Sequence, residues 1–195
     1  MADDPYVYPG TNVLRNHFGI RDATELAERE AGLTAVRVTE LERRFIPGDY
    51  DLVHLQAVHR KIFGDLYPWA GELRTVKVAK DESLFALPEH ISPYLTTLFV
   101  DLAREDFLHG LGREQFVERL THYYAEINAV HPFREGNGRA QRAFLGQIAK
   151  AAGYPIVWAR LDPERNVHAA RASHRGNNSP LHEMLSDLLG TMPAP

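Results

Sequence analysis

Apolar residues recur at the spacing of a helix face along most of the chain, and this pattern restricts the fold more than any other feature. Glycine or proline interrupts each run, so the pattern predicts separate helices of ordinary length. The clearest stripe is Ile91, Leu95, Leu98 and Leu102. The runs predict helices over about residues 22–31, 34–45, 52–64, 88–109, 113–129, 139–152, 163–173 and 180–190. We therefore expect a mainly α protein.

One short segment departs from the helical period. Val76 and Val78 alternate with polar residues, and a polar turn at 80–82 separates them from a second run at 83–87. The pattern predicts one β-hairpin over about residues 74–87. A two-stranded hairpin is marginally stable alone, so we expect it to lean on the helices and to offer its open edge to an extended segment of another protein.

The densest polar cluster lies between two predicted helices, from His131 to Arg142. Gly136-Asn137-Gly138 comes just before the second helix, where backbone N–H groups and an uncapped first turn can converge on a phosphate. Arg139 and Arg142 are three residues apart and share one face of that turn. Cations there oppose the helix dipole, at about 0.3–1 kcal/mol each, unless an anion lies between them and the helix start. We therefore expect more than one phosphate to bind.

The same stretch supplies a carboxylate and a base. Glu135 lies beside the positive cluster, and a Mg²⁺ ion held by one carboxylate and by phosphate oxygens would reconcile the opposite charges. His131 follows the preceding helix, and an imidazole with an ordinary pKa of about 6.5 can accept a proton at neutral pH. Pro132 and Phe133 are expected to anchor the loop. The stretch matches neither a P-loop nor a GxGxxG dinucleotide motif.

Composition and charge narrow the remaining functions. A chain of 195 residues with 44% hydrophobic residues is expected to form one soluble domain. Its formal net charge of −4 gives no drive toward nucleic acid, and no apolar run is long enough to span a membrane. The sequence contains no cysteine, which excludes disulfides and thiolate metal sites, and the chain start lacks a signal-peptide pattern. We expect a cytoplasmic protein. His54 and His59 are five apart on one predicted helix, a spacing that disfavours a shared metal.

The stretch from His131 to Arg142 resembles the core motif of the Fic proteins, HxFx(D/E)GNGRxxR, and fits it without a departure. The resemblance extends from an aromatic arm at residues 1–20, through Pro68-Trp69-Ala70-Gly71, to the final helices. It implies a Fic fold, which is a helical bundle with an active-site loop between two central helices and one β-hairpin flap. The whole chain, 1–195, is then expected to be a single Fic domain, with the motif at 131–142 and the flap at about 74–87.

The resemblance also implies a reaction, the transfer of AMP from ATP to a Tyr, Thr or Ser hydroxyl of a target protein with release of pyrophosphate. By position in the motif, His131 is the general base and Glu135 is the Mg²⁺ ligand. The implied ligands of the α- and β-phosphates are Gly136, Asn137 and Gly138, and those of the β- and γ-phosphates are Arg139 and Arg142. The flap would align the target by strand addition, and the expected docking residues are Thr75, Val76, Lys77 and, as a clamp, Phe85.

Two further features bear on the branch of the family. Gly138 favours adenylyl transfer, because phosphorylating relatives usually carry lysine there. Family members are commonly inhibited by a glutamate in an (S/T)xxxE(G/N) motif, and the nearest segment here, Ser179 to Met184, lacks the final residue and is interpreted as a helix cap. The resemblance therefore implies a toxin whose small antitoxin supplies a glutamate to Arg142. Alternatives are a non-catalytic Fic binding module, an enzyme that uses another nucleotide, a kinase, or a piece of a secreted effector.

Overall fold

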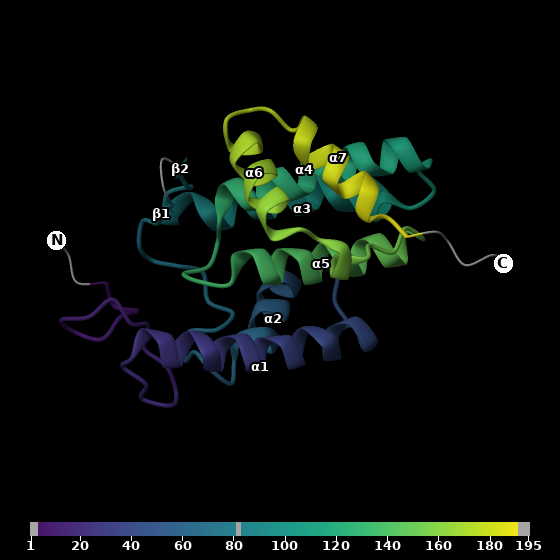
Figure 1. Cartoon of the computed structure of the whole chain (residues 1–195). Coiled ribbons are helices and arrows are strands. Elements are labelled where there is room, and N and C mark those ends of the chain that lie inside the picture. Colours follow the sequence, from purple (N-terminus) through teal and green to yellow (C-terminus); the bar gives the residue numbers. More distant parts are fainter. Residues whose placement is uncertain (1–3, 81–82, 191–195) are drawn as a thin grey trace.

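The computed structural model describes residues 4–80 and 83–190, and helices dominate this part of the chain. In Figure 1, α5 crosses the middle of the molecule, with α1 and α2 on one side and α4, α6 and α7 on the other. The α-helices are α1 (Ala23–Arg43), α2 (Leu52–Phe63), α3 (Pro88–Arg104), α4 (Arg113–Val130), α5 (Asn137–Ala151), α6 (Pro163–His174) and α7 (Ser179–Leu188). Short 3₁₀ helices, η1 (Asp106–Leu108) and η2 (Trp158–Arg160), join some of them. The mainly α architecture is confirmed.

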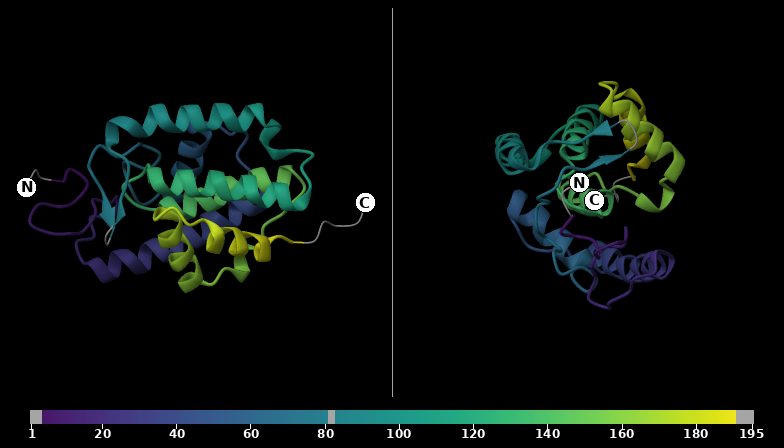
Figure 2. Two further views of the ribbon diagram at one scale, coloured as in Figure 1. Left: turned by 90° about the horizontal axis from the view of Figure 1, so that it is seen from above. Right: turned by 90° about the vertical axis from the view of Figure 1, so that its left-hand side faces the viewer.

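The core is built around the two central helices. Phe116, Leu120 and Tyr123 of α4 and Phe144 and Ile148 of α5 are all fully buried. The views in Figure 2 show α4 lying between α3 and the pair formed by α6 and α7. Apolar residues on more than one face explain why α4 and α5 occupy the centre. No helix within the described ranges is both long and apolar enough to cross a membrane.

Helix α1 corrects one prediction. Two helices were expected, over 22–31 and 34–45, because Gly32 was interpreted as a stop, but a single helix runs from Ala23 to Arg43. Gly32 lies on the exposed side of this helix with nothing near the position of a Cβ. A helical glycine costs only about 1 kcal/mol relative to alanine. The buried residues Leu26 and Leu41, one on each side of it, hold the helix against the body.

The hairpin is also shorter than predicted. Instead of strands over about 76–78 and 83–87, the ladder consists of β1 (Ala79–Lys80) and β2 (Ser83–Leu84). The predicted turn residues 81 and 82 lie outside the described ranges. Nearer the base of the flap, the carbonyls of Val76 and Ala86 accept hydrogen bonds from the side chain of Arg74. A side chain therefore joins the two arms where backbone pairing was expected.

The helix ends differ slightly from the predicted ones. The predicted helix over 88–109 ends at Arg104, and η1 follows it. Ser179 was interpreted as a cap, but it is the first residue of α7, and its N–H donates to Asn177 Oδ1 at 3.1 Å. The side chain two residues earlier therefore takes the capping role.

The N-terminal arm packs against the base of the flap and the loop between α4 and α5. The Tyr6 ring packs edge-to-face on Trp69 with centroids 5.4 Å apart, and its hydroxyl accepts a hydrogen bond from Thr75 N at 3.0 Å. Asp4 Oδ2 forms an ion pair with Arg134 Nη2 at 2.9 Å. The arm therefore contacts both the flap and the loop between α4 and α5.

Candidate active site

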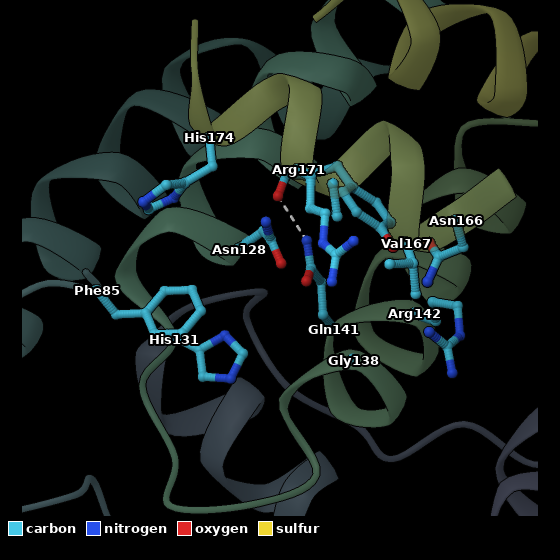
Figure 3. Close-up of a pocket in the computed structure, with 12 residues that line it drawn as sticks. Phe85, Asn128, His131, Gly138, Gln141, Arg142, Asn166, Val167, Arg171 and His174 are labelled. Carbon is cyan, nitrogen blue, oxygen red and sulfur yellow. Dashed lines mark hydrogen bonds between the residues drawn. The ribbon is translucent and has the colours of Figure 1, made fainter. Parts of the chain in front are cut away.

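The motif forms the turn between α4 and α5, and two left-handed residues shape it. His131 ends α4 with φ 52° and ψ 63°, and Gly136 precedes α5 with φ 78°. Gly136 has no room for a side chain, because a Cβ would lie 2.1 Å from Cζ of Phe63. The positive φ and this close approach both require glycine. The turn brings the imidazole of His131 to the same side as the first turn of α5, as Figure 3 shows.

Four of the predicted site residues line one pocket: Phe85, His131, Gly138 and Arg142. In Figure 3 they surround a space that α6 closes from above. The α6 wall was not predicted, because its residues lie on a helix with few apolar residues. The only signal was their helical spacing, since Asn166, Ala170 and His174 recur every four residues along one face. The α6 residues that line the pocket are Asn166, Val167, Ala170, Arg171 and His174.

The flap covers the predicted base. The Phe85 ring stacks on the His131 imidazole with centroids 3.9 Å apart and planes 15° apart. On its other side Phe85 meets the edge of His174, with centroids 5.6 Å apart. The residue expected to clamp a target side chain therefore occupies the space next to the base (Figure 3).

The Asn137 side chain closes the loop on itself. Its Oδ1 accepts a hydrogen bond from Phe133 N, and its Nδ2 donates to Phe133 O, both at 2.8 Å. Asn137 is 7% exposed and Phe133 is 1% exposed, so the two bonds are shielded from water. The first bond of α5 runs from Ala140 N to Gly136 O. The N–H groups of residues 137–139 precede it, as at any helix start, and their polarity suits an anion.

The two arginines of the motif have different surroundings. Arg139 Nη2 lies 2.6 Å from Glu30 Oε1 of α1 and 3.5 Å from Glu135 Oε1, and Arg139 Nη1 donates to Thr34 Oγ1 at 3.1 Å. Glu30 therefore supplies the anion that a cation at a helix start requires. Glu30 also accepts a hydrogen bond from the Tyr67 hydroxyl, whose pKa is raised by burial and by this carboxylate.

Arg142 makes no ion pair with any carboxylate in the described ranges. Its guanidinium reaches back along α5, where Nη1 lies 3.2 Å from the position of a Cβ on Gly138. Burial raises the pKa of the Tyr124 hydroxyl, and the nearby Arg142 guanidinium opposes this rise. The positive charge of Arg142 is therefore available to a ligand.

Arg142 also lines a second cavity, which is a groove. This groove lies between α1, α5 and the segment over 155–159. Arg139 and Lys150 line it too, and Lys150 Nζ lies 4.9 Å from the centre of the Phe45 ring. The apolar residues of the groove are Val38, Leu41, Phe45, Ala143, Pro155, Ile156, Val157, Trp158 and Ala159.

His59 packs against the loop between α4 and α5 and stabilises it. It is fully buried between the rings of Phe63 and Phe133. Its Nδ1 accepts a hydrogen bond from Gly71 N at 2.8 Å, which assigns the proton to Nε2, and Nε2 donates to Glu135 O at 3.0 Å. Burial lowers the pKa of His59 to about 4, so the ring is neutral. The spacing of His54 and His59 disfavoured a shared metal and predicted ordinary surface or core histidines, but it gave no sign that His59 supports the loop.

Glu135 is the carboxylate that could take part in metal binding. Its side chain is 45% exposed, and Oε1 accepts a hydrogen bond from Gly136 N at 2.9 Å. A partly exposed carboxylate next to a phosphate-type helix start suits Mg²⁺, which binds through one or two carboxylates and substrate phosphates. The donor set therefore fits a nucleotide-bound Mg²⁺ ion.

Comparison with known proteins gives a consistent family. The model of the Fic/DOC family matches residues 49–149. The probable protein adenylyltransferase Fic of Salmonella typhimurium is 42% identical over 178 residues, which is 91% of this chain and 88% of that protein. The protein adenylyltransferase VbhT of Bartonella schoenbuchensis is also 42% identical, but the chain spans only 37% of its length. The crystal structure of BepC from Bartonella tribocorum with bound AMPPNP superposes with a TM-score of 0.89 at 26% identity, covering 96% of this chain and 97% of that one.

Proposed function

Because the chain belongs to the Fic/DOC family, we infer that it is a protein adenylyltransferase that moves AMP from ATP to a hydroxyl group of a target protein. One observation carries this conclusion. His131, the first turn of α5 at Gly138, and Arg142 line the same pocket, so a base, an anion site and a cation converge on one space. Phe85 of the flap closes that space.

The transfer is a substitution at the α-phosphorus of ATP. The target hydroxyl oxygen forms a bond to phosphorus, and its proton passes to the imidazole of His131. The bond from the α-phosphorus to the bridging oxygen breaks, and pyrophosphate leaves with the electron pair. The N–H groups at the start of α5 and the guanidinium of Arg142 stabilise the negative charge on the phosphates. Gly136, Asn137 and Gly138 would contribute backbone N–H groups, and Arg139 would join Arg142 if ATP displaces Glu30.

Glu135 would hold Mg²⁺ together with phosphate oxygens. When bound, the ion withdraws charge from the phosphates and so favours departure of pyrophosphate. Glu135 Oε1 accepts a hydrogen bond from Gly136 N, which holds the carboxylate beside the start of α5, and this bond would break when Gly136 N binds a phosphate.

The flap is the proposed docking edge for the target. The backbone of Thr75, Val76 and Lys77 lies outside the β1–β2 ladder, and the side chains of Thr75 and Lys77 are exposed. A target strand that pairs here would bring its hydroxyl toward His131. Phe85 must leave the face of His131 when the target side chain enters, and it is then placed to clamp that side chain.

The groove between α1, α5 and the segment over 155–159 supports the proposal of a separate antitoxin. Arg142 lines both cavities. An acidic residue of a partner bound in the groove would therefore form an ion pair with the guanidinium that the γ-phosphate needs. Glu183 of this chain does not meet the requirement, because it is exposed on α7 beside Arg119 and His122. The proposed partner is a small protein with an amphipathic helix carrying a glutamate, and the enzyme would act as a toxin in the cytoplasm.

The position of the radioactive label in ATP tests the reaction. The chain is incubated with lysate and ATP labelled on either the α- or the γ-phosphate, and His131→Ala serves as the control. Label transferred from the α-phosphate and lost in His131→Ala is the expected result. Label from the γ-phosphate would indicate a kinase, and no label in several lysates would favour a non-catalytic binding module.

Expression of the chain alone tests the toxin proposal. We expect growth arrest that His131→Ala relieves and that a co-expressed antitoxin suppresses. A chain that adenylylates lysate proteins strongly and leaves growth unaffected would contradict the toxin role while leaving the enzymatic activity intact.

A further inference from the structure

One arginine outside the motif is buried beneath the active-site loop. Arg74 lies at the base of the flap and is 2% exposed. Burial lowers the pKa of its guanidinium, but an arginine side chain stays protonated in proteins, so the group remains charged. A buried cation is stable only where other atoms replace its water, so its partners indicate its purpose.

Two of the oxygens around Arg74 belong to the end of α4. Arg74 Nε donates to His131 O at 2.8 Å, and Nη2 donates to Val130 O at 3.1 Å. The last carbonyls of a helix lack partners within it and carry the negative end of its dipole, so a cation here stabilises the helix end. The backbone N–H of Arg74 donates to Pro132 O at 2.9 Å. Arg74 therefore holds three successive carbonyls, those of Val130, His131 and Pro132.

The backbone of His131 needs such support. Its left-handed conformation is unfavourable for a residue with a Cβ. The N–H of His131 donates to Ile127 O at 3.0 Å, and its carbonyl accepts from Arg74. The peptide groups on both sides of its Cα are therefore fixed, and the direction of the Cα–Cβ bond that carries the imidazole follows from them.

The other two oxygens belong to the flap. Arg74 Nη1 donates to Val76 O at 2.7 Å, and Nη2 donates to Ala86 O at 2.5 Å. These carbonyls lie on opposite arms of the flap and outside the β1–β2 ladder. Ala86 directly follows Phe85, whose ring stacks on His131. One guanidinium thus holds the flap and the predicted base at the same time.

We propose that Arg74 is a positioning residue that couples the flap to His131, so that a target strand docked on the flap sets the orientation of the base. This inference rests on the adenylyl transfer proposed above. Arginine suits the role because its planar group carries five donors that point in different directions. A lysine would keep the charge, but one ammonium group cannot reach the end of α4 and both arms of the flap together.

The test compares Arg74→Lys with the wild type. The probes are AMPPNP for calorimetric binding, and the lysate protein that the wild type labels most strongly, after purification, for kinetics. We expect AMPPNP affinity within about 2-fold of the wild type and a transfer rate at saturating ATP lower by about 10- to 100-fold, because misplacing a reacting group is costly. A wild-type rate would overturn the proposal. An equal loss of affinity and rate would also overturn it, because that result describes general damage to the site.

Arg119→Lys is the matched control. Arg119 forms two hydrogen bonds to Glu105, at 2.7 and 2.5 Å, and none to the flap residues that the structure describes. We expect this variant to lose thermal stability while keeping its transfer rate. If the wild type itself labels no protein from the α-phosphate of ATP, the proposed function fails, whatever the variants do.

Hydrogen exchange in the wild type decides the case in which Arg74→Lys does not fold. Coupling through Arg74 predicts that the amides of residues 74–79 and 84–87 open together with those of 130, 131 and 133, with the same protection. A flap that exchanges freely while 130, 131 and 133 stay protected would overturn the proposal.

Discussion

Replacing Asn137 by alanine should destabilise the protein, because the Asn137 side chain holds the loop between α4 and α5. The side chain satisfies both backbone groups of Phe133, and no water reaches them because Phe133 is 1% exposed. Each buried group left without a partner costs about 1–3 kcal/mol, so the two together cost at least about 2 kcal/mol. In a chain of this size that minimum lowers Tm by about 4–8 °C. Calorimetry or circular dichroism measures the shift.

Activity should fall as well, because the same two bonds fix the loop that presents His131 and the start of α5. The matched control is Asn16→Ala in the N-terminal arm. Asn16 is 8% exposed and makes the same kind of clamp, with Oδ1 accepting from Ile20 N at 3.0 Å and Nδ2 donating to Ile20 O at 2.8 Å. Asn16→Ala should lose comparable stability but keep its transfer rate well below its Tm.

An Asn137→Ala variant with the Tm of the wild type and weakened ATP binding would refute this reasoning. That result would mean that the side chain acts directly on the nucleotide and that the loop holds its shape without it.

Three other predictions concern neighbouring residues. The pKa of His59 is about 4 in the folded protein and about 6.5 in the unfolded chain. Because the unfolded chain binds the proton first, the free energy of unfolding falls by up to about 3 kcal/mol as the pH drops from 6.5 to 4. Urea titrations should show a smaller loss in His59→Gln. Gly136→Ala should cost about 2–4 kcal/mol in thermal melts, because its Cβ would lie 2.1 Å from the Phe63 ring at a positive φ. Gly138→Ala should change Tm by only about 2 °C, because its Cβ meets the mobile end of Arg142, and calorimetry should show weaker ATP binding.

The features that could be predicted from sequence are local ones. The ends of α4 and α5 follow from apolar periodicity and from the break at Pro132 and Gly136, all within one short stretch. The pocket formed by His131, Gly138 and Arg142 follows from their spacing around that break. Gly32 was misjudged because a glycine within a helix and a glycine that ends one look alike until the burial of the residues beyond it is known.

The features that could not be predicted depend on partners far along the chain. Arg139 meets Glu30 across 109 positions, and Arg74 meets His131 across 57. A charged residue on a polar helix face or at the start of a strand gives no sign of such a partner. The wall from α6 is a similar case, because Asn166 and Arg171 look like ordinary surface residues in the sequence.

The contacts of the N-terminal arm and α1 bear on how this enzyme could be divided or recombined. The family match covers 49–149, yet Asp4 and Glu30 precede it and α6 follows it. A graft of that segment alone into another scaffold would leave Arg134 without Asp4 and Arg139 without Glu30. It would also remove the side of the pocket that α6 forms. The smallest portable unit therefore begins with the arm and extends through α6 to α7, whose buried residues hold α6 against α4.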